Sequence, residues 1–148
     1  MPLDRLAELY GFEPPREKGL NTVEACEGVL KGEVKGFIGL GGNFVRAIPD
    51  RDRMEPAWRK MRLTVQIATK LNRSHLVNGE VALLLPCKGR IERDSQATGD
   101  QTVSMEDSTA TIHASFGKRE PASPDLLSEP TIVAGIAKAT LPPNPRLD

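Results

Sequence analysis

The sequence predicts an α/β fold: a three-layer Rossmann-like domain with a mostly parallel sheet, plus a long polar excursion. Helix-like and strand-like runs alternate along residues 21–85, and such alternation is typical of a parallel sheet covered by helices. The strand-like runs VKGFIGL, LTVQIAT and VALLLP are mostly apolar, as strands buried on both faces are. We therefore expect parallel strands near 34–40, 62–68 and 81–85.

The composition limits the class of protein. The chain has 148 residues, about one domain, and its 20 acidic and 20 basic side chains balance. It therefore has no net field that would attract nucleic acid or an acidic membrane. No apolar run reaches the ~20 residues of a membrane span, and the start, MPLDRLAELYGF, lacks the pattern of a signal peptide. We expect a cytoplasmic protein with no nucleic-acid partner and no membrane span.

Two helices are predicted before the first strand. Leu3 to Tyr10 places apolar residues at helical spacing, and Gly11 can end this helix. A proline-containing connector follows. Asn21 then suits the cap of a second helix, and Glu24, three residues on, completes a capping box. Gly32 suits its left-handed end.

A third helix is predicted between the first and second strands. It covers Asp50 to Met61, where Met54 and Trp58 recur at helical spacing. Pro56 lies inside this range and favours a later start at Glu55. We interpret Trp58 as a core or interface residue rather than a platform for stacking a ligand.

The second half of the chain changes character. Residues 88–108 are polar, lack a sustained period and form an unusually long connection. Thr109 to Ser115 alternates as a strand does, Ser128 to Ala139 has the pattern of an amphipathic helix, and LPPNPRLD reads as an exit tail. We divide the chain into an N-terminal helix and connector (1–18), an α/β lobe (19–87), a polar segment (88–119) and a returning helix with its tail (120–148).

Two glycines and an asparagine, Gly41-Gly42-Asn43, follow the first predicted strand in the stretch FIGLGGNFVRAIPD. We call this predicted turn the glycine corner. Ligands of open α/β sheets lie outside the carboxyl ends of the strands, and glycines there let the backbone approach a ligand closely. An asparagine side chain offers both a donor and an acceptor to a base or a ribose. The corner is neither G-x-G-x-x-G nor a P-loop. By itself it favours a plain turn.

The ordered set of motifs adds a family resemblance. GEVKGFIGLGGNFVRAIPD, LTVQIATKLNRSH, VALLLPCKGRIERD and SEPTIVAGIAKAT together resemble the large (alpha) subunit of molybdopterin oxidoreductases, in particular its formate-dehydrogenase-like members. The resemblance covers nearly all of residues 19–141. Such enzymes carry molybdenum or tungsten on two molybdopterin guanine dinucleotides, and their Rossmann-like lobe holds the nucleotide end of one of them.

The resemblance implies a set of cofactor-binding residues. Gly41, Gly42 and Asn43 match the corner that holds the guanosine, with Asn43 reading it. Gln66 on the second strand and Glu80 before the third match further polar residues near the nucleotide. The family's Glu-Asn-Pro is here Gly-Asn-Phe, so its carboxylate and its rigid proline are both missing.

The resemblance also implies that this chain is a fragment of a larger enzyme. A 4Fe-4S cluster and the residues at the metal would lie outside it, so no catalytic or metal-binding residue is predicted here and the isolated chain is expected to be inactive. Its partners would be the remaining domains of the parent large subunit and an electron-transfer subunit. Arg90, Glu92 and Arg93 would lie in the segment that runs towards the active site.

Other reactive side chains have plainer interpretations. His75 could contact a phosphate or the pterin, but a surface or satisfied histidine fits better, and His113 reads as a strand-face histidine. Cys26 and Cys87 are interpreted as inert thiols. Asn72-Arg73-Ser74 is formally a glycosylation sequon, which we attribute to chance.

Two other functions stay open on the sequence. One is a free-standing nucleotide-binding module that uses the same corner for a simple nucleotide. The other is a non-catalytic interaction domain whose partner binds residues 88–108. Binding of a nucleotide to the chain favours the first, and a partner interface mapped to the polar segment favours the second.

Overall fold

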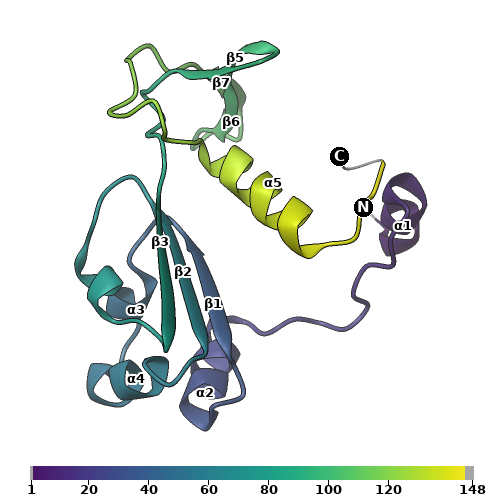
Figure 1. Cartoon of the computed structure of the whole chain (residues 1–148). Coiled ribbons are helices and arrows are strands. Elements are labelled where there is room, and N and C mark those ends of the chain that lie inside the picture. Colours follow the sequence, from purple (N-terminus) through teal and green to yellow (C-terminus); the bar gives the residue numbers. More distant parts are fainter. Residues whose placement is uncertain (1, 146–148) are drawn as a thin grey trace.

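The computed structural model describes residues 2–145, and its centre is a parallel sheet with strand order β1-β2-β3 (Figure 1). The strands are β1 (Gly36–Leu40), β2 (Leu63–Ala68) and β3 (Val81–Pro86). Ile38 lies opposite Val65, and Val65 opposite Leu83. The predicted strands and their parallel direction are confirmed. All three carboxyl ends therefore lie at one edge of the sheet.

Helices cover one face of this sheet (Figure 1). They are α2 (Thr22–Lys31), α3 (Phe44–Ala47) and α4 (Arg51–Trp58). Trp58 is 1% exposed, and its ring lies 4.8 Å from that of Phe37 in an edge-on arrangement and 5.9 Å from that of Phe44. Such aromatic pairs add to the free energy of burial. The interpretation of Trp58 as a core residue is confirmed.

The predicted ends of the first two helices are confirmed. Helix α1 (Leu3–Tyr10) ends at Gly11, which has a φ of 68°. In α2, the Asn21 side chain accepts a hydrogen bond from the Glu24 N–H at 3.0 Å, and the Glu24 carboxylate accepts one from the Asn21 N–H at 2.8 Å. The capping box thus satisfies two backbone donors that a helix start leaves free.

The segment after the first strand differs from the prediction. Helix α4 begins at Arg51, because the N–H groups of Arg53 and Met54 both donate to the Asp50 carbonyl, at 3.0 and 2.8 Å. The later start at Glu55 is therefore wrong, and the helix ends at residue 58 rather than 61. The short helix α3 was not predicted, because four residues are too few to show a period.

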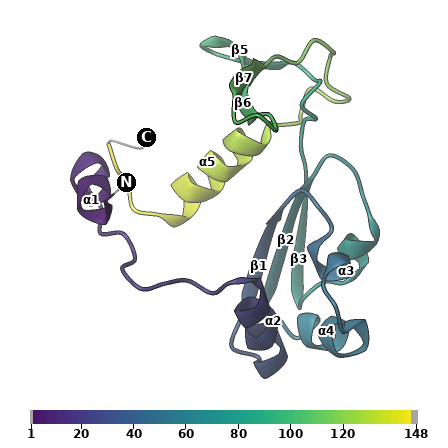
Figure 2. The ribbon, with the colours of Figure 1, turned by 180° about the vertical axis from the view of Figure 1, so that it is seen from behind.

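The opposite face of the sheet is covered only in part. Helix α5 (Glu129–Thr140) lies on the side of the sheet away from α3 and α4 (Figure 2). Its Ile132 and Ile136 pack with a small cluster that includes Val65 and Ile67. In-register neighbours share a face of a sheet, and five apolar side chains of this face are between 36% and 60% exposed: Ile38, Leu40, Leu63, Val81 and Leu83. The second helical layer therefore leaves much of this apolar face open.

The polar segment is more ordered than the sequence predicted. Strands β4 (Asp94–Gln96) and β5 (Gly99–Gln101) form one antiparallel pair, and β6 (Val103–Glu106) and β7 (Ile112–Ser115) form another. The expected strand at 109–115 is confirmed over its second part. No strand was predicted over 88–108, where β4, β5 and β6 lie. Strands of three or four residues are too short to show a sustained period in the sequence.

The two ends of the described chain meet. After α5, the Asn144 side chain donates a hydrogen bond to the Tyr10 carbonyl at 2.9 Å, next to the end of α1. Of the predicted exit tail, residues 146–148 lie outside the described residues. Within residues 2–145, no helix has both the length and the apolar character that crossing a membrane requires.

A pair of glycine substitutions tests this packing. A side chain at Gly79 would collide with the Met61 carbonyl, whereas nothing lies within 4 Å of a side chain at Gly135 in α5. We expect Gly79→Ala to lower the free energy of unfolding by about 1–3 kcal/mol. Gly135→Ala should raise it by about 0.5–1 kcal/mol, because alanine favours a helix. Urea unfolding measures both, and equal effects of the two variants would contradict the packing of the loop before β3.

Candidate functional site

The glycine corner at the end of β1 requires an unusual backbone. Gly41 has a φ of 69° and Gly42 a φ of 73°, a region where other L-residues are strained by about 1–2 kcal/mol. The Gly41 N–H donates to the Ile67 carbonyl at 2.7 Å and so ties the corner to β2. The interpretation of these glycines as positions of positive φ is confirmed. The chain therefore leaves β1 by a sharp turn that bears no side chains.

The backbone of the corner borders open space. A Cβ on Gly42 would meet no atom within 4 Å, and a Cβ on Gly41 would meet only the Glu129 carboxylate, at 3.8 Å. Asn43 is exposed and precedes α3, and its carbonyl accepts from the Arg46 N–H at 2.9 Å. In the described part of the chain, the Asn43 side chain has no hydrogen-bond partner. The corner thus offers a ligand both a bare backbone and a free amide.

The loop after β2 holds the corner in place through Asn72. Its side chain donates to the Gly42 carbonyl at 2.7 Å and accepts from the Ser74 N–H at 2.8 Å. Its own N–H donates to Nδ1 of His75 at 3.1 Å. Asn72 was noted in the sequence only as part of a sequon. The signal that could have found it is an asparagine at the cap of a helical turn, η1 (Arg73–Leu76), after a strand.

His75 is a satisfied, buried histidine, as the plainer interpretation expected. It is 6% exposed, and the hydrogen bond from Asn72 to Nδ1 places the ring proton on Nε2. Its role is to fix the loop that holds the corner.

The structure does not bring all five predicted site residues together. Gly41, Gly42 and Asn43 are consecutive, whereas Gln66 is 5% exposed on the helix-covered face beside Gly39, where a Cβ would lie 2.8 Å from its Oε1. Glu80 is exposed and precedes β3, with its N–H bonded to the Met61 carbonyl at 2.8 Å. It therefore lies at the amino end of the sheet, opposite the corner.

Glu92 organises the polar segment where it leaves the sheet. Its carboxylate accepts hydrogen bonds from the N–H of Gly89 at 2.6 Å and from the N–H of Ala122 at 2.7 Å. These two bonds, in that order, hold the pKa of the carboxyl group below its usual value. Glu92 thus joins the start of the polar segment to the strand-free stretch that leads back to α5.

A second polar contact lies beside it. Lys88 Nζ is 3.0 Å from Asp94 Oδ1, and the two side chains are only 11% and 17% exposed. Burial works against the charged form of Asp94, but hydrogen bonds from Ser128, Lys88 and Gln96 outweigh it and lower the pKa of the carboxyl group. A partly buried ion pair of this kind is sensitive to the loss of either partner.

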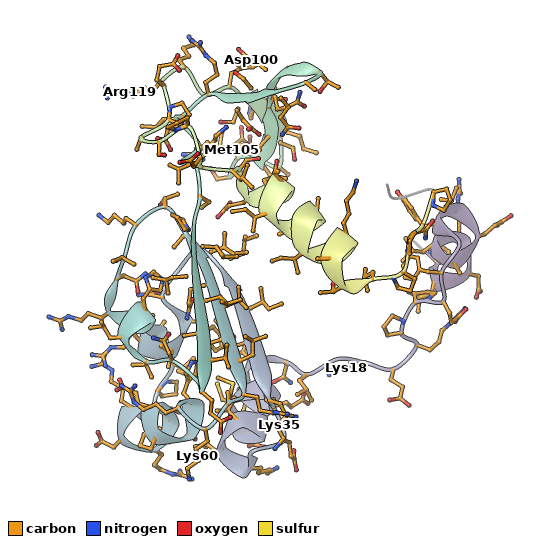
Figure 3. All side chains as sticks on the ribbon, in the orientation of Figure 1. Lys18, Lys35, Lys60, Asp100, Met105 and Arg119 are labelled. Atoms are coloured by element: carbon orange, nitrogen blue, oxygen red, sulfur yellow. The ribbon has the colours of Figure 1, made fainter. Side chains whose placement is uncertain are left out.

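These contacts border a cavity of about 800 Å³ between the polar segment and α5. Arg90 and Glu92 line it, and Arg90 also lies 2.9 Å from the sulfur of Met105, which Figure 3 labels beside α5. Arg93 instead forms an ion pair with Glu120, with 3.0 Å between Nη1 and Oε1. Of the three residues expected near the active site of a parent enzyme, two thus share this cavity.

The remaining candidates take structural roles. His113 pairs with Asp107 at 2.7 Å on exposed strand β7, as expected of a strand-face histidine. Cys26 and Cys87 are free thiols, and burial raises the pKa of each. A raised thiol pKa disfavours the reactive thiolate form. Among residues 2–145, no group of three or more histidine, cysteine or acidic side chains is arranged to hold a metal.

Known proteins resemble this chain over nearly its whole length. It is 44% identical over 146 residues to the uncharacterized oxidoreductase Rv2900c of Mycobacterium tuberculosis, covering 97% of this chain and 19% of that protein. It is 44% identical over 140 residues to Protein YdeP of Escherichia coli K12, covering 95% of this chain and 18% of that protein. No family model matches the chain.

The chain is therefore related to proteins named as oxidoreductases. It spans about a fifth of the length of these relatives.

Removal of the Asn72 side chain tests how the corner is held. Asn72→Ala loses the bonds to Gly42 and Ser74, and each such bond contributes about 0.5–1.5 kcal/mol. We expect faster amide hydrogen exchange at Gly41 and Ser74 and a lower free energy of unfolding. Lys60→Ala is the control, because Lys60 is exposed at the far end of the sheet (Figure 3). Unchanged exchange in Asn72→Ala would contradict the role of the asparagine.

The hydrogen bonds of the Glu92 carboxylate predict how the stability of the chain depends on pH. The pKa of Glu92 is lower in the folded chain than in the unfolded chain. The ionised carboxylate therefore stabilises the fold at a pH above the unfolded-state pKa, and this stabilisation is lost as the pH falls through the folded-state pKa. Between about pH 7 and about pH 3, thermal stability should fall more steeply in the wild type than in Glu92→Gln. Glu106→Gln, an exposed glutamate of the same segment, should keep the wild-type slope. Equal slopes for all three proteins would contradict the contact.

Proposed function

We propose that this chain is one lobe of a longer molybdopterin-dependent oxidoreductase of the formate-dehydrogenase-like kind. In this proposal it binds the guanosine end of a molybdopterin guanine dinucleotide. The observation that carries it is the corner Gly41–Asn43, which combines an open backbone with a free side-chain amide at the carboxyl edge of a parallel sheet. Ligands of open α/β sheets bind at that edge.

The residues of the corner fit a flat, hydrogen-bonding group. The space over Gly42 allows a base or ribose to approach the main chain, and Asn43 supplies both a donor and an acceptor. Gln66 is 5% exposed and lies beside Gly39, so in this proposal it does not touch the ligand. Glu80, at the other end of the sheet, falls outside this site. When bound, the molybdenum of such a cofactor supplies the oxidation–reduction chemistry.

The open face of the sheet supports a place within a larger protein. Five apolar side chains there are at least 36% exposed, and exposed apolar patches of this kind mark surfaces that other protein covers. The relatives are about five times as long as this chain. We propose that the remaining domains of the parent subunit cover this face. The 4Fe-4S cluster and the electron-transfer subunit then lie outside the chain, which alone has no turnover.

One alternative is favoured by a specific observation. The corner and the loop that holds it come from β1 and β2 alone, through the bonds Gly41–Ile67 and Asn72–Gly42. A site completed by two neighbouring strands can serve a free-standing nucleotide-binding module. Tight binding of a simple nucleotide to the isolated chain distinguishes this alternative, since a lobe of a larger site binds weakly alone.

The proposal is tested in a longer protein. This chain replaces the matched region of the mycobacterial relative, and the purified chimera is assayed for molybdenum and for guanine nucleotide released by acid. We expect both in the chimera. In Asn43→Ala both should fall about tenfold, because the lost hydrogen bonds leave groups of the base unsatisfied at a cost of about 1–3 kcal/mol.

Lys60→Ala in the same chimera is the control for folding and yield. If the Asn43 variant keeps as much nucleotide as this control, the corner is only a turn. If a well-folded chimera carries neither molybdenum nor guanine nucleotide, the assignment to molybdopterin enzymes is wrong.

A further inference from the structure

We propose that Arg46, Arg51 and Arg73 form an oxyanion site that binds the phosphate groups of a nucleotide beside the glycine corner. The proposal deepens the proposed nucleotide-binding function and rests on it for the identity of the ligand. Its basis is a hollow of about 340 Å³ lined by Asn43, Arg46, Arg51, Asn72 and Arg73. Three of these five residues are cationic, two are amides, and none is acidic.

The arginines reach the hollow from separate segments. Arg46 lies in α3 and Arg51 begins α4, and both follow β1. Arg73 begins η1 after β2, and η1 is in contact with α3. Figure 1 shows the teal turn of η1 beside α3. The gathering therefore depends on the parallel pairing of two neighbouring strands and not on a basic run in the sequence.

The charge of this cluster is only partly compensated. Glu55 pairs with Arg46, and Asp50 lies 3.7 Å from Arg53, so these two acids are already engaged. Asp52, next to Arg51 in sequence, is exposed and does not line the hollow. Arg51 and Arg73 are exposed, and their side chains form no hydrogen bond or ion pair with any residue of the range 2–145. Like charges held together repel one another. An anion in the hollow would relieve that repulsion.

The chemistry of the hollow favours a phosphate. A guanidinium has five N–H donors in a planar fork, which matches the geometry of phosphate oxygens. Arg46 uses Nη1 for Glu55 and keeps other donors free. The amides of Asn43 and Asn72 add neutral donors to the same wall. The chain as a whole has no net charge, so the cluster suits a compact anion rather than a long nucleic acid.

The position beside the corner indicates where the anion belongs. Asn43 borders both the hollow and the open backbone of Gly42. Asn72 lines the hollow and at the same time holds the Gly42 carbonyl at 2.7 Å. A nucleotide with its base or ribose over the corner can therefore place its phosphates among the arginines.

The test is binding of inorganic pyrophosphate, GDP and guanosine to the 148-residue chain at low ionic strength, followed by amide NMR shifts. We expect pyrophosphate and GDP to shift the amides of residues 43–46 and 72–74, and added salt to weaken both. Arg51→Ala and Arg73→Ala should each weaken pyrophosphate binding about tenfold, since charge-assisted hydrogen bonds are lost.

Arg62→Ala is the matched control, because Arg62 is exposed and precedes β2 at the other end of the sheet. The site is overturned if pyrophosphate does not bind, or if Arg62→Ala weakens it as much as Arg73→Ala. If pyrophosphate binds through the arginines and GDP binds no more tightly, the oxyanion site stands and the guanosine role of the corner fails. Tighter binding of GDP than of pyrophosphate supports both.

Discussion

The parallel pairing of β1 with β2 is the constraint on which the candidate site depends. It brings Leu40 and Ile67, which are 27 residues apart in sequence, into register at the ends of the two strands. The Gly41 N–H adds one more bond to the Ile67 carbonyl, so the glycine corner is an extension of the ladder. The loop after β2 then reaches the corner through Asn72. A slip in this register would separate the corner, its support and the arginines.

The corner also shows how a rigid scaffold carries an open surface. Beneath it, Phe37, Phe44 and Trp58 form an aromatic core that fixes β1 against α3 and α4. Above it, two glycines leave the main chain uncovered. The strain that other residues would meet at positive φ is avoided by the glycines themselves. The aromatic core therefore holds the strand rigid, while the neighbouring glycines leave the main chain accessible to a ligand.

Helices cover the two faces of the sheet to different extents. One face is filled by three helices, while the other receives only the first turns of α5 near Val65 and Ile67. Apolar side chains in water cost about 25 cal/mol per Å² relative to a buried state, so a face left open is a surface suited to further protein. The polar segment, held by Glu92 and by the pair Lys88–Asp94, stands at the rim of that face.

The sequence by itself determined the sheet and the ends of its main helices, because local signals specify them. Apolar runs marked the three strands, the capping pair Asn21 and Glu24 started α2, and paired glycines marked the corner. The tertiary structure alone decided what surrounds the corner. Asn72 and the arginines come together only through strand pairing, and the exposed hairpins after β3 depend on main-chain hydrogen bonds. Glu80 was separated from the corner because a strand's direction fixes the edge at which each end lies, and Gln66 because its side chain is buried on the helix-covered face.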